Sequence, residues 1–432
     1  MKPRLVISCP STSRSGYGDH SRDLIRSLID MNKFDIHIFD QVWGTCPKDA
    51  LGKDDEDISS LIIKNPQQFM TEKQPDVWIQ VTVPNEFQPV GKYNIGVTAG
   101  IETTLCDSTW IQGCNRMDKV IVPSEHAKYV FQIANYKAVN PQTGQEDTNS
   151  PELKLEVPVE VLFEGLDMDF FKKTSEIPGT IKSSLDSIKE DFCFLFCGHW
   201  LHGVMGQDRK DVGMTIRVFL ETFKGKSKRN MPALILKTSS AGFSIGERED
   251  IIKKIKQIRS HVQHQGDLPS IYFLHGDLTK EELNGLYNHP KVKAMVSFTK
   301  GEGFGRPLLE YSVTGKPTIA SNWSGHIDFL SAYGVMLPGK LNKVHESVVW
   351  DKVILKDSEW FTVDYGYASG ILKDVHKNYK KYHEKSRKQT QYVKDNFTLK
   401  EMTKKFEEIM DDSVLPSFDV KLPAIEEMQT YE

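Results

Sequence analysis

The sequence predicts an α/β protein in which buried parallel strands alternate with helices. Residues 4–9 form an apolar run, which a glycine-containing loop and a helical segment follow. Residues 294–298 form a second such run, followed by a glycine-rich loop, a helix with an apolar face and a further strand at 318–320. Strand–helix–strand units of this kind build parallel sheets. With 432 residues, the chain is long enough for two or three domains.

The composition narrows the functional classes. Hydrophobic residues make up 39% of the chain and charged residues 26%, which is typical of an ordinary soluble protein. The 55 basic and 59 acidic residues give a net charge of −4. The chain therefore has no global basic field of the kind that holds nucleic acid, although a local basic patch stays open.

The N-terminus and the cysteines predict a cytoplasmic protein. The first apolar run is too short for a secretory signal, and no stretch reaches the length that crosses a bilayer. The six cysteines show no paired spacing of the kind that binds zinc, and Cys193 and Cys197 lie in an apolar, strand-like run. We therefore expect reduced thiols.

The loop after the first strand, PSTSRSGYG, precedes a helix for which Asp19 is the expected N-cap. This order of strand, loop and helix is typical of the start of a Rossmann-like domain. Gly16 and Gly18 lack the third glycine of a dinucleotide-binding fingerprint, which argues against a dehydrogenase. A plain tight turn remains the alternative interpretation of this loop.

Further strands at 77–83 and 93–99 lead to a second loop. Glu102 falls at the end of the later strand, and a helix-start glutamate is its plain interpretation. His126 follows another strand, where a surface histidine on a helix is the plain interpretation. Residues 140–151 are polar and contain proline and glycine, which predicts a flexible excursion.

The second half of the chain opens on a strand that runs into His199. Arg209 and Lys210 then precede an amphipathic helix at 214–223, and the plain interpretation of this basic pair is a solvated helix start. Lys237 ends a later strand. Burial of a lysine there is costly unless an anionic group meets it, so Lys237 is a second candidate for anion binding.

The most informative stretch is GEGFGRPLLE at residues 301–310, which follows a buried strand. Open parallel sheets bind ligands beyond the carboxyl ends of their strands. Pro307 suits the first helical position, because its missing N–H group costs nothing there. The free N–H groups of a helix start favour a phosphate, and Gly303 and Gly305 let the backbone approach it closely.

Glu302 and Glu310 lie at the two ends of this loop–helix junction and predict a nucleotide-sugar ligand. Glu302, on the loop, can accept hydrogen bonds from sugar hydroxyls and face the positive charge that grows on the anomeric carbon. Glu310, one turn into the helix, can accept hydrogen bonds from both ribose hydroxyls with its two oxygens. Two glutamates at this spacing are common by chance, so the surrounding strand, glycines and apolar helix face give the pair its weight.

The segment EGFGRPLLE resembles the Glu-x7-Glu motif of retaining glycosyltransferases with the GT-B fold, of the large family 4 type. The segments GIETT, CNRMD and EGLDMDFF resemble parts of the N-terminal domain of the same enzymes. The resemblance implies an α/β protein with two Rossmann-like domains whose parallel sheets face each other across a cleft. It places the N-terminal, acceptor-side domain at 1–185 and the nucleotide-sugar domain at 186–375. Helices at 376–432 are then expected to pack back on the first domain.

The resemblance also implies a role for each matching residue. The residues expected to take part in catalysis are Glu302, Lys210, Arg209 and Glu102. Those expected to bind the donor are Glu310, Gly303, Phe304, Gly305, Lys237, Gly16, Gly18 and His199. Those expected on the acceptor side are Tyr17 and His126. The family carries an arginine at the position of His199, so Arg209 is the expected replacement in holding the diphosphate.

Asp167 and Asp169 form the kind of carboxylate pair that binds manganese in the other glycosyltransferase fold. A single Asp-x-Asp is a weak signal, and this one lies in the expected linker between the domains. We therefore expect no metal and no cofactor, with the nucleotide-sugar as a substrate.

Together these features predict transfer of a sugar from a nucleotide-diphosphate sugar to an acceptor hydroxyl. The resemblance implies that this transfer is metal-independent and retains the anomeric configuration. A UDP-sugar is the expected donor. The acceptor is left open between a glycan and hydroxymethylated cytosine in bacteriophage DNA, and a phage protein would act in the host cytoplasm. Two alternatives with the same fold are a non-catalytic sugar-nucleotide-binding protein and a sugar-nucleotide epimerase. The oligomeric state is not predicted.

Overall fold

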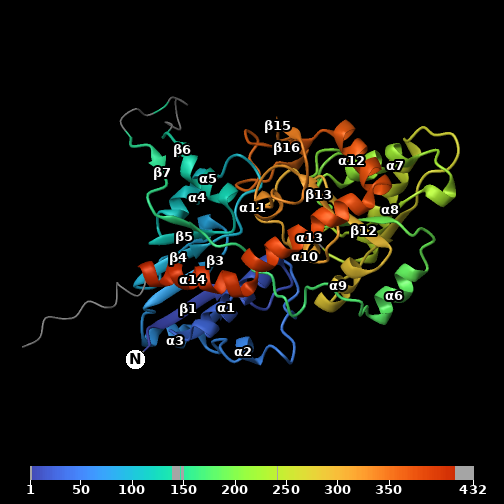
Figure 1. The fold of residues 1–432 in the computed structure, drawn as a ribbon. Helices are drawn as coiled ribbons and strands as arrows, with labels where there is room; N and C mark the ends of the chain where they lie inside the picture. The colour runs from blue at the N-terminus through green and yellow to red at the C-terminus, as the bar shows by residue number, and fades with distance from the viewer. Residues whose placement is uncertain (1, 139–145, 147–149, 241, 414–432) are drawn as a thin grey trace, which may run out of the picture.

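Two parallel sheets of six strands each organise the protein (Figure 1). The computed structural model describes residues 2–138, 146, 150–240 and 242–413. The strand order is β2-β1-β3-β4-β5-β8 in the first sheet and β11-β10-β9-β12-β13-β14 in the second. In the second sheet, β9, β10 and β11 run from the middle to one edge, and β12, β13 and β14 run from the middle to the other edge. This is the Rossmann arrangement.

The first sheet is covered by helices on both faces. Leu5 and Ile7 pack towards α1 and α14, whereas Val6 packs towards α4 and α5, because successive side chains of a strand point to opposite faces. The elements of this part are β1 (Arg4–Cys9), α1 (Gly16–Met31), β2 (Asp35–Asp40), α2 (Glu56–Ser59), α3 (Pro66–Glu72), β3 (Val77–Val81), β4 (Tyr93–Val97), α4 (Ser108–Cys114), β5 (Lys119–Val122), α5 (Glu125–Ile133), β6 (Asn135–Tyr136), β7 (Leu153–Lys154) and β8 (Val159–Val161).

The second sheet has the same layered construction. Phe194 and Phe196 pack towards α7, α8 and α12, whereas Leu195 packs towards α6, α9 and α10. The elements of this part are α6 (Gly179–Asp186), β9 (Cys193–Cys197), α7 (Val212–Phe223), β10 (Ala233–Lys237), α8 (Ile245–Ser260), β11 (Ile271–Leu274), α9 (Lys280–Asn288), β12 (Val292–Ser297), α10 (Arg306–Ser312), β13 (Thr318–Ser321), α11 (Ile327–Leu330) and β14 (Val335–Leu337).

The C-terminal helices connect the two parts. The helices α12 (Tyr365–Lys377) and α13 (Tyr379–Asn396) pack on the second part, and α14 (Leu399–Ser413) lies along α1 of the first (Figure 1). Met402 and Phe406 of α14 are buried in the core of the first sheet. The division into 1–185, 186–375 and 376–432 stays a prediction, but the return of α14 shows how the end of the chain ties the two parts together.

An antiparallel hairpin, β15 (Gly339–Lys343) and β16 (Glu359–Val363), follows the last strand of the second sheet. The N–H group of Thr104 donates to the carbonyl oxygen of Glu359 at 2.9 Å, and that of Phe361 donates to Lys300 at 2.9 Å. The hairpin therefore touches both the first part of the chain and the segment that leads to Glu302. Sequence analysis did not single out this hairpin.

Three observations concern the rest of the chain. Among the described residues, no helix combines the length and the apolar character that crossing a bilayer requires. The six cysteines all lie in described segments, and each is a free thiol. The polar excursion expected at 140–151 lies, apart from residues 146, 150 and 151, outside the described residues.

Candidate active site

The glycine-rich loop leads from the end of β12 into α10, as predicted. The helix begins at Arg306, so Pro307 lies in its first turn, one position later than expected. Gly305 is the N-cap and has a left-handed backbone with φ of 97°. A Cβ atom at this position would also lie only 2.9 Å from the Cβ of His326. Both the backbone conformation and the packing therefore require glycine at 305.

Glu302 lies between two basic side chains from the loop that precedes α7. Lys210 Nζ donates a hydrogen bond to Glu302 Oε1 at 2.5 Å, and Arg209 Nη1 donates to Glu302 Oε2 at 3.2 Å. Burial by itself raises the pKa of Glu302, but Lys210 and Arg209 outweigh burial and lower the pKa to about 2. Glu302 is therefore ionised at neutral pH, and it holds both cations at one point.

The loop that follows β4 brings a carboxylate of the first domain to the same point. Glu102 Oε1 lies 3.6 Å from Arg209 Nη1. A Cβ on Gly301 would lie 1.9 Å from the carbonyl oxygen of Glu102, and one on Gly303 would lie 2.1 Å from that of Ala99. These glycines allow backbone contact between the two domains, which sequence analysis had not foreseen. The predicted contact of Gly303 with a phosphate stays a prediction.

Glu310, on α10, has a different set of neighbours. Arg306 Nε donates to Glu310 Oε1 at 3.3 Å, and Tyr287 Oη donates to the other carboxylate oxygen at 3.2 Å. Arg306 Nη1 also donates to Asp23 Oδ2 at 2.7 Å and lies 3.7 Å from Glu164 Oε2. Burial raises the pKa of Glu310 to about 7, although Arg306 opposes the rise. One guanidinium thus serves three buried carboxylates.

Lys237 and His199 lie near the carboxyl ends of β10 and β9. Lys237 Nζ donates to the carbonyl oxygen of Gly276 at 2.7 Å, so a neutral carbonyl group accepts one of the three hydrogen bonds that this ammonium can donate. His199 Nδ1 lies 3.2 Å from the hydroxyl of Ser239, and the His199 side chain is exposed. A cavity of about 210 Å³ opens beside Lys237 and Gly276. This is the edge of the sheet at which open parallel sheets hold ligands.

The first loop caps α1 differently from the prediction. The N-cap is Ser15, whose hydroxyl accepts a hydrogen bond from the N–H group of Gly18 at 3.0 Å. The prediction of Asp19 as N-cap is wrong, because the helix begins at Gly16, so Asp19 falls within its first turn. A Cβ on Gly18 would lie 2.2 Å from the carbonyl oxygen of Ser13, whereas Gly16 has open space around this position. Packing therefore requires glycine only at 18.

Tyr17 contacts the loop that carries Glu102, and His126 contacts the second domain. Tyr17 Oη accepts a hydrogen bond from the N–H group of Ala99 at 3.0 Å, and burial raises the pKa of Tyr17 to about 12. The ring of His126 packs against Trp323 with centroids 4.7 Å apart, and burial lowers the pKa of His126 to about 4. His126 is therefore a neutral imidazole at the contact between the domains.

Phe304 and the Asp-x-Asp pair have local structural contacts. Phe304 is buried against Phe329 with ring centroids 5.2 Å apart. The N–H group of Asp169 donates to Asp167 Oδ1 at 3.0 Å, which is a contact within a turn. Within the described ranges, no group of three or more histidine, cysteine, aspartate or glutamate side chains is arranged to hold a metal ion. The roles assigned from the sequence to the individual site residues stay predictions.

A second buried network lies behind the basic pair, and sequence analysis missed it. Asp211, next to Lys210, is fully buried and has a positive φ of 51°. Its Oδ2 accepts a hydrogen bond from Tyr365 Oη at 2.6 Å and lies 3.5 Å from Lys300 Nζ. These residues come from distant parts of the sequence, so spacing could not reveal them. The sequence pattern Arg-Lys-Asp was the only available signal.

The arrangement of the two sheets matches that of known glycosyltransferase structures. Anabaena HepE in complex with UDP-glucose matches with a TM-score of 0.58 at 10% identity, over 95% of this chain and 100% of that chain. A glycosyltransferase from Rickettsia africae matches with 0.59 at 14% identity, over 96% and 99%. Sucrose-phosphate synthase from Thermosynechococcus elongatus matches with 0.60 at 11% identity, over 96% and 100%. The chain has the GT-B fold.

In this GT-B chain, the candidate site lies where the loops after β4 and β12 meet, between the two Rossmann-like domains. No protein-family model and no curated protein matches the sequence. At these low identities the likeness establishes the GT-B fold, and a proposal about chemistry must rest on the residues of the site itself.

Proposed function

We propose that this protein transfers a sugar from a nucleotide-diphosphate sugar to an acceptor hydroxyl, with retention of configuration and without a metal. The observation that carries the proposal is the meeting of Arg209, Lys210 and Glu302 at the carboxyl end of β12, opposite Glu102 of the first domain. The HepE complexes with UDP-glucose, and with UDP and glucose, support a UDP-sugar as the donor.

Arg209 and Lys210 supply the electrostatic part of the proposed reaction. As the bond between the anomeric carbon and the diphosphate oxygen breaks, negative charge grows on the leaving diphosphate. The buried Lys210 and the partly buried Arg209 stabilise that charge, the role that a metal ion has in other enzymes. The acceptor oxygen bonds to the anomeric carbon from the same face, and its proton passes to the leaving phosphate oxygen.

Glu302 and Glu310 hold the two ends of the donor. Glu302, with a pKa of about 2, is an anion that accepts hydrogen bonds from the sugar hydroxyls and faces the positive charge on the anomeric carbon. Glu310 accepts the ribose hydroxyls when it is ionised. Arg306 already lies within hydrogen-bonding distance of Glu310 and orients this carboxylate.

For the acceptor we propose a glycan or a hydroxymethylated cytosine in DNA. The test incubates the full chain with UDP-sugars in the presence of a metal chelator, with each acceptor class in turn, and follows the anomeric configuration of the product by NMR. We expect an α-linked donor to give an α-linked product. An inverted product would contradict retention, and epimerisation without any acceptor would identify an epimerase. Binding of UDP-sugar without turnover on either acceptor class would favour a binding protein.

A further inference from the structure

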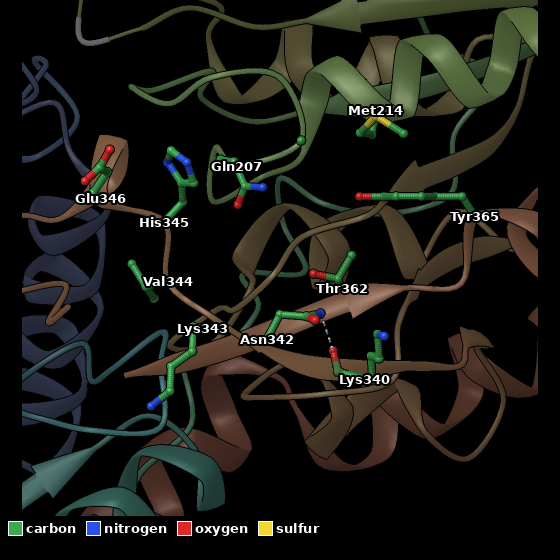
Figure 2. Close-up of a pocket in the computed structure, with 11 residues that line it drawn as sticks. Gln207, Met214, Lys340, Asn342, Lys343, Val344, His345, Glu346, Thr362 and Tyr365 are labelled. Carbon is green, nitrogen blue, oxygen red and sulfur yellow. Dashed lines mark hydrogen bonds between the residues drawn. The ribbon is translucent and has the colours of Figure 1, made fainter. Parts of the chain in front are cut away.

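A second concave region lies in the C-terminal domain. A cavity of about 640 Å³ opens between the segment 206–214 and the β15–β16 hairpin (Figure 2). This volume lies within the range of small-ligand sites. All its lining residues fall between 206 and 365, and neither the basic pair nor the two glutamates of the Glu-x7-Glu motif are among them. The cavity is therefore distinct from the proposed donor site.

The charges around the cavity favour an anionic ligand. Lys340 and Lys343 of β15 line it, whereas Glu346 is its single acidic lining residue. Lys343 Nζ donates to the carbonyl oxygen of Asp357 at 3.1 Å, and Figure 2 shows the Lys343 side chain turned away from the other lining residues, so Lys340 supplies the positive charge of the cavity. In the described part of the chain, no carboxylate forms an ion pair with Lys340. Figure 2 shows Glu346 and Lys340 at opposite ends of the cavity.

The remaining lining groups suit a hydroxylated ring. Gln207 and Asn342 present side-chain amides from opposite walls, and an amide offers both donors and an acceptor to neighbouring hydroxyl groups. Asn342 Nδ2 already donates to the carbonyl oxygen of Lys340 at 3.3 Å, which leaves its second N–H group and its oxygen for a ligand. Thr362 adds a hydroxyl group from β16. The side chain of Met214 lies over the ring of Tyr365 at one end of the cavity (Figure 2), which provides apolar surface for the C–H groups of a sugar.

We propose that this cavity is a second binding site, for a small sugar that carries a phosphate or carboxylate group. Lys340 binds the anionic group, the two amides bind the hydroxyls, and Met214 and Tyr365 contact the ring. The ligand is a monosaccharide or a short oligosaccharide, because the cavity volume is that of a small-molecule site.

The cavity is also connected to the proposed donor site. Tyr365 Oη donates to Asp211, which follows Lys210 directly in the chain. Thr362 Oγ1 accepts a hydrogen bond from Lys300 Nζ at 3.0 Å, and Lys300 lies two residues before the motif glutamate. A ligand that contacts Tyr365 and Thr362 therefore touches both segments that form the donor site. This coupling rests on the proposed function, whereas binding in the cavity does not.

The test measures binding of glucose 6-phosphate, glucuronate, glucose, inorganic phosphate and a short single-stranded oligodeoxynucleotide to the full chain, by calorimetry with and without UDP. We expect glucose 6-phosphate or glucuronate to bind more tightly than glucose or phosphate, with UDP present or absent. Lys340→Ala and Lys340→Gln should each weaken this binding by about tenfold, because a charge-assisted hydrogen bond is lost. Lys394→Ala, which changes an exposed lysine on α13, should leave it unchanged.

Three results would overturn the proposal: no binding of either charged sugar, binding that both Lys340 variants leave unchanged, or displacement of the sugar by UDP. Tighter binding of the oligodeoxynucleotide, lost in the same variants, would replace the sugar by nucleic acid. Product analysis then separates two roles of the ligand. An acceptor is itself glycosylated, whereas an effector changes the rate of sugar transfer and is recovered unchanged. If UDP itself does not bind to the protein, that result counts against the proposed donor site and leaves the cavity proposal standing.

Discussion

Glu302 and Glu310 flank one loop–helix junction, yet their electrostatic surroundings are opposite. Both side chains are buried, and burial raises the pKa of a carboxylate. Two cations contact Glu302 and lower its pKa to about 2. One guanidinium serves Glu310 together with Asp23 and Glu164, and the pKa of Glu310 rises to about 7. The number of cations for each carboxylate therefore decides the charge of each site, since burial is common to both.

This difference suits two separate tasks. The region of Glu302 holds two cations that a diphosphate can share, so it is prepared for an anionic leaving group. The region of Glu310 holds more carboxylate than cation, so it is prepared to accept hydrogen bonds from neutral hydroxyl groups. The following predictions sharpen this comparison, from the largest expected effect to the smallest.

Removing one carboxylate from each region should have unequal effects on stability. Glu302→Gln leaves the buried Lys210 and the partly buried Arg209 without their main partner, so we expect the free energy of unfolding to fall by about 3–5 kcal/mol. Glu310→Gln leaves two carboxylates for Arg306, so we expect a loss of roughly 1 kcal/mol or less. Urea denaturation of the two variants at pH 7 measures both values, and equal losses would contradict the comparison.

Lys210→Met should slow sugar transfer by about 100- to 1000-fold in kcat, because the leaving diphosphate loses one of its two stabilising cations. Steady-state kinetics with a UDP-sugar donor measure the effect, with Lys394→Met as the matched control on the exposed face of α13. An unchanged kcat would show that another residue stabilises the leaving diphosphate, and Lys237 is the next candidate.

The effect of Glu164→Gln on stability should depend on pH. Burial raises the pKa of Glu164 from 4.5 to about 7, so between these values the folded state holds a proton that the unfolded state has lost. The stability from this proton is complete below pH 4.5 and is lost as the pH rises through 7. Glutamine needs no proton, so the variant should gain roughly 2–3 kcal/mol relative to wild type between pH 5 and pH 8. If the difference in unfolding free energy between the variant and wild type is the same at every pH, the raised pKa of Glu164 is contradicted.

Glu310→Ala should weaken UDP binding by about 1–3 kcal/mol through the loss of buried hydrogen bonds to the ribose. The wild-type affinity should also fall as the pH drops from 8 to 6, because Glu310, with a pKa of about 7, gains a proton and can no longer accept both ribose hydroxyls. The variant lacks this part of the pH dependence. Calorimetry at both pH values tests whether Glu310 binds the ribose of UDP. Unchanged UDP affinity in the variant would contradict this role.

Much of the fold could be predicted because its signals are local. The glycine-rich loop, the proline in the first turn of α10 and the apolar strands around them stand close together in the sequence, and the structure has these elements. Asp19 shows the limit of such reasoning. A capping residue was expected just before the apolar pattern, but the helix extends one turn further towards Ser15, where the pattern is not apolar.

The candidate site could be predicted only in part. Arg209, Lys210 and Glu302 were each expected to take part in catalysis, and the structure brings the three side chains into contact, whereas their roles stay predictions. The cluster around Arg306 could not be foreseen, because its partners Asp23 and Glu164 are separated from it by long stretches of chain. Three-dimensional packing alone brings such residues together. The same holds for the β15–β16 hairpin and its cavity, where no sequence motif marks the lining residues.

The most direct test of the donor site is a calorimetric titration of the full chain with UDP, GDP, ADP and UDP-sugars, first in the presence of a metal chelator and then with manganese. The account predicts that one nucleotide, expected to be UDP, binds selectively without metal, and that Lys210→Met loses most of this affinity. No binding, or binding only with manganese, would contradict the account and would return Asp167 and Asp169 to consideration as metal ligands.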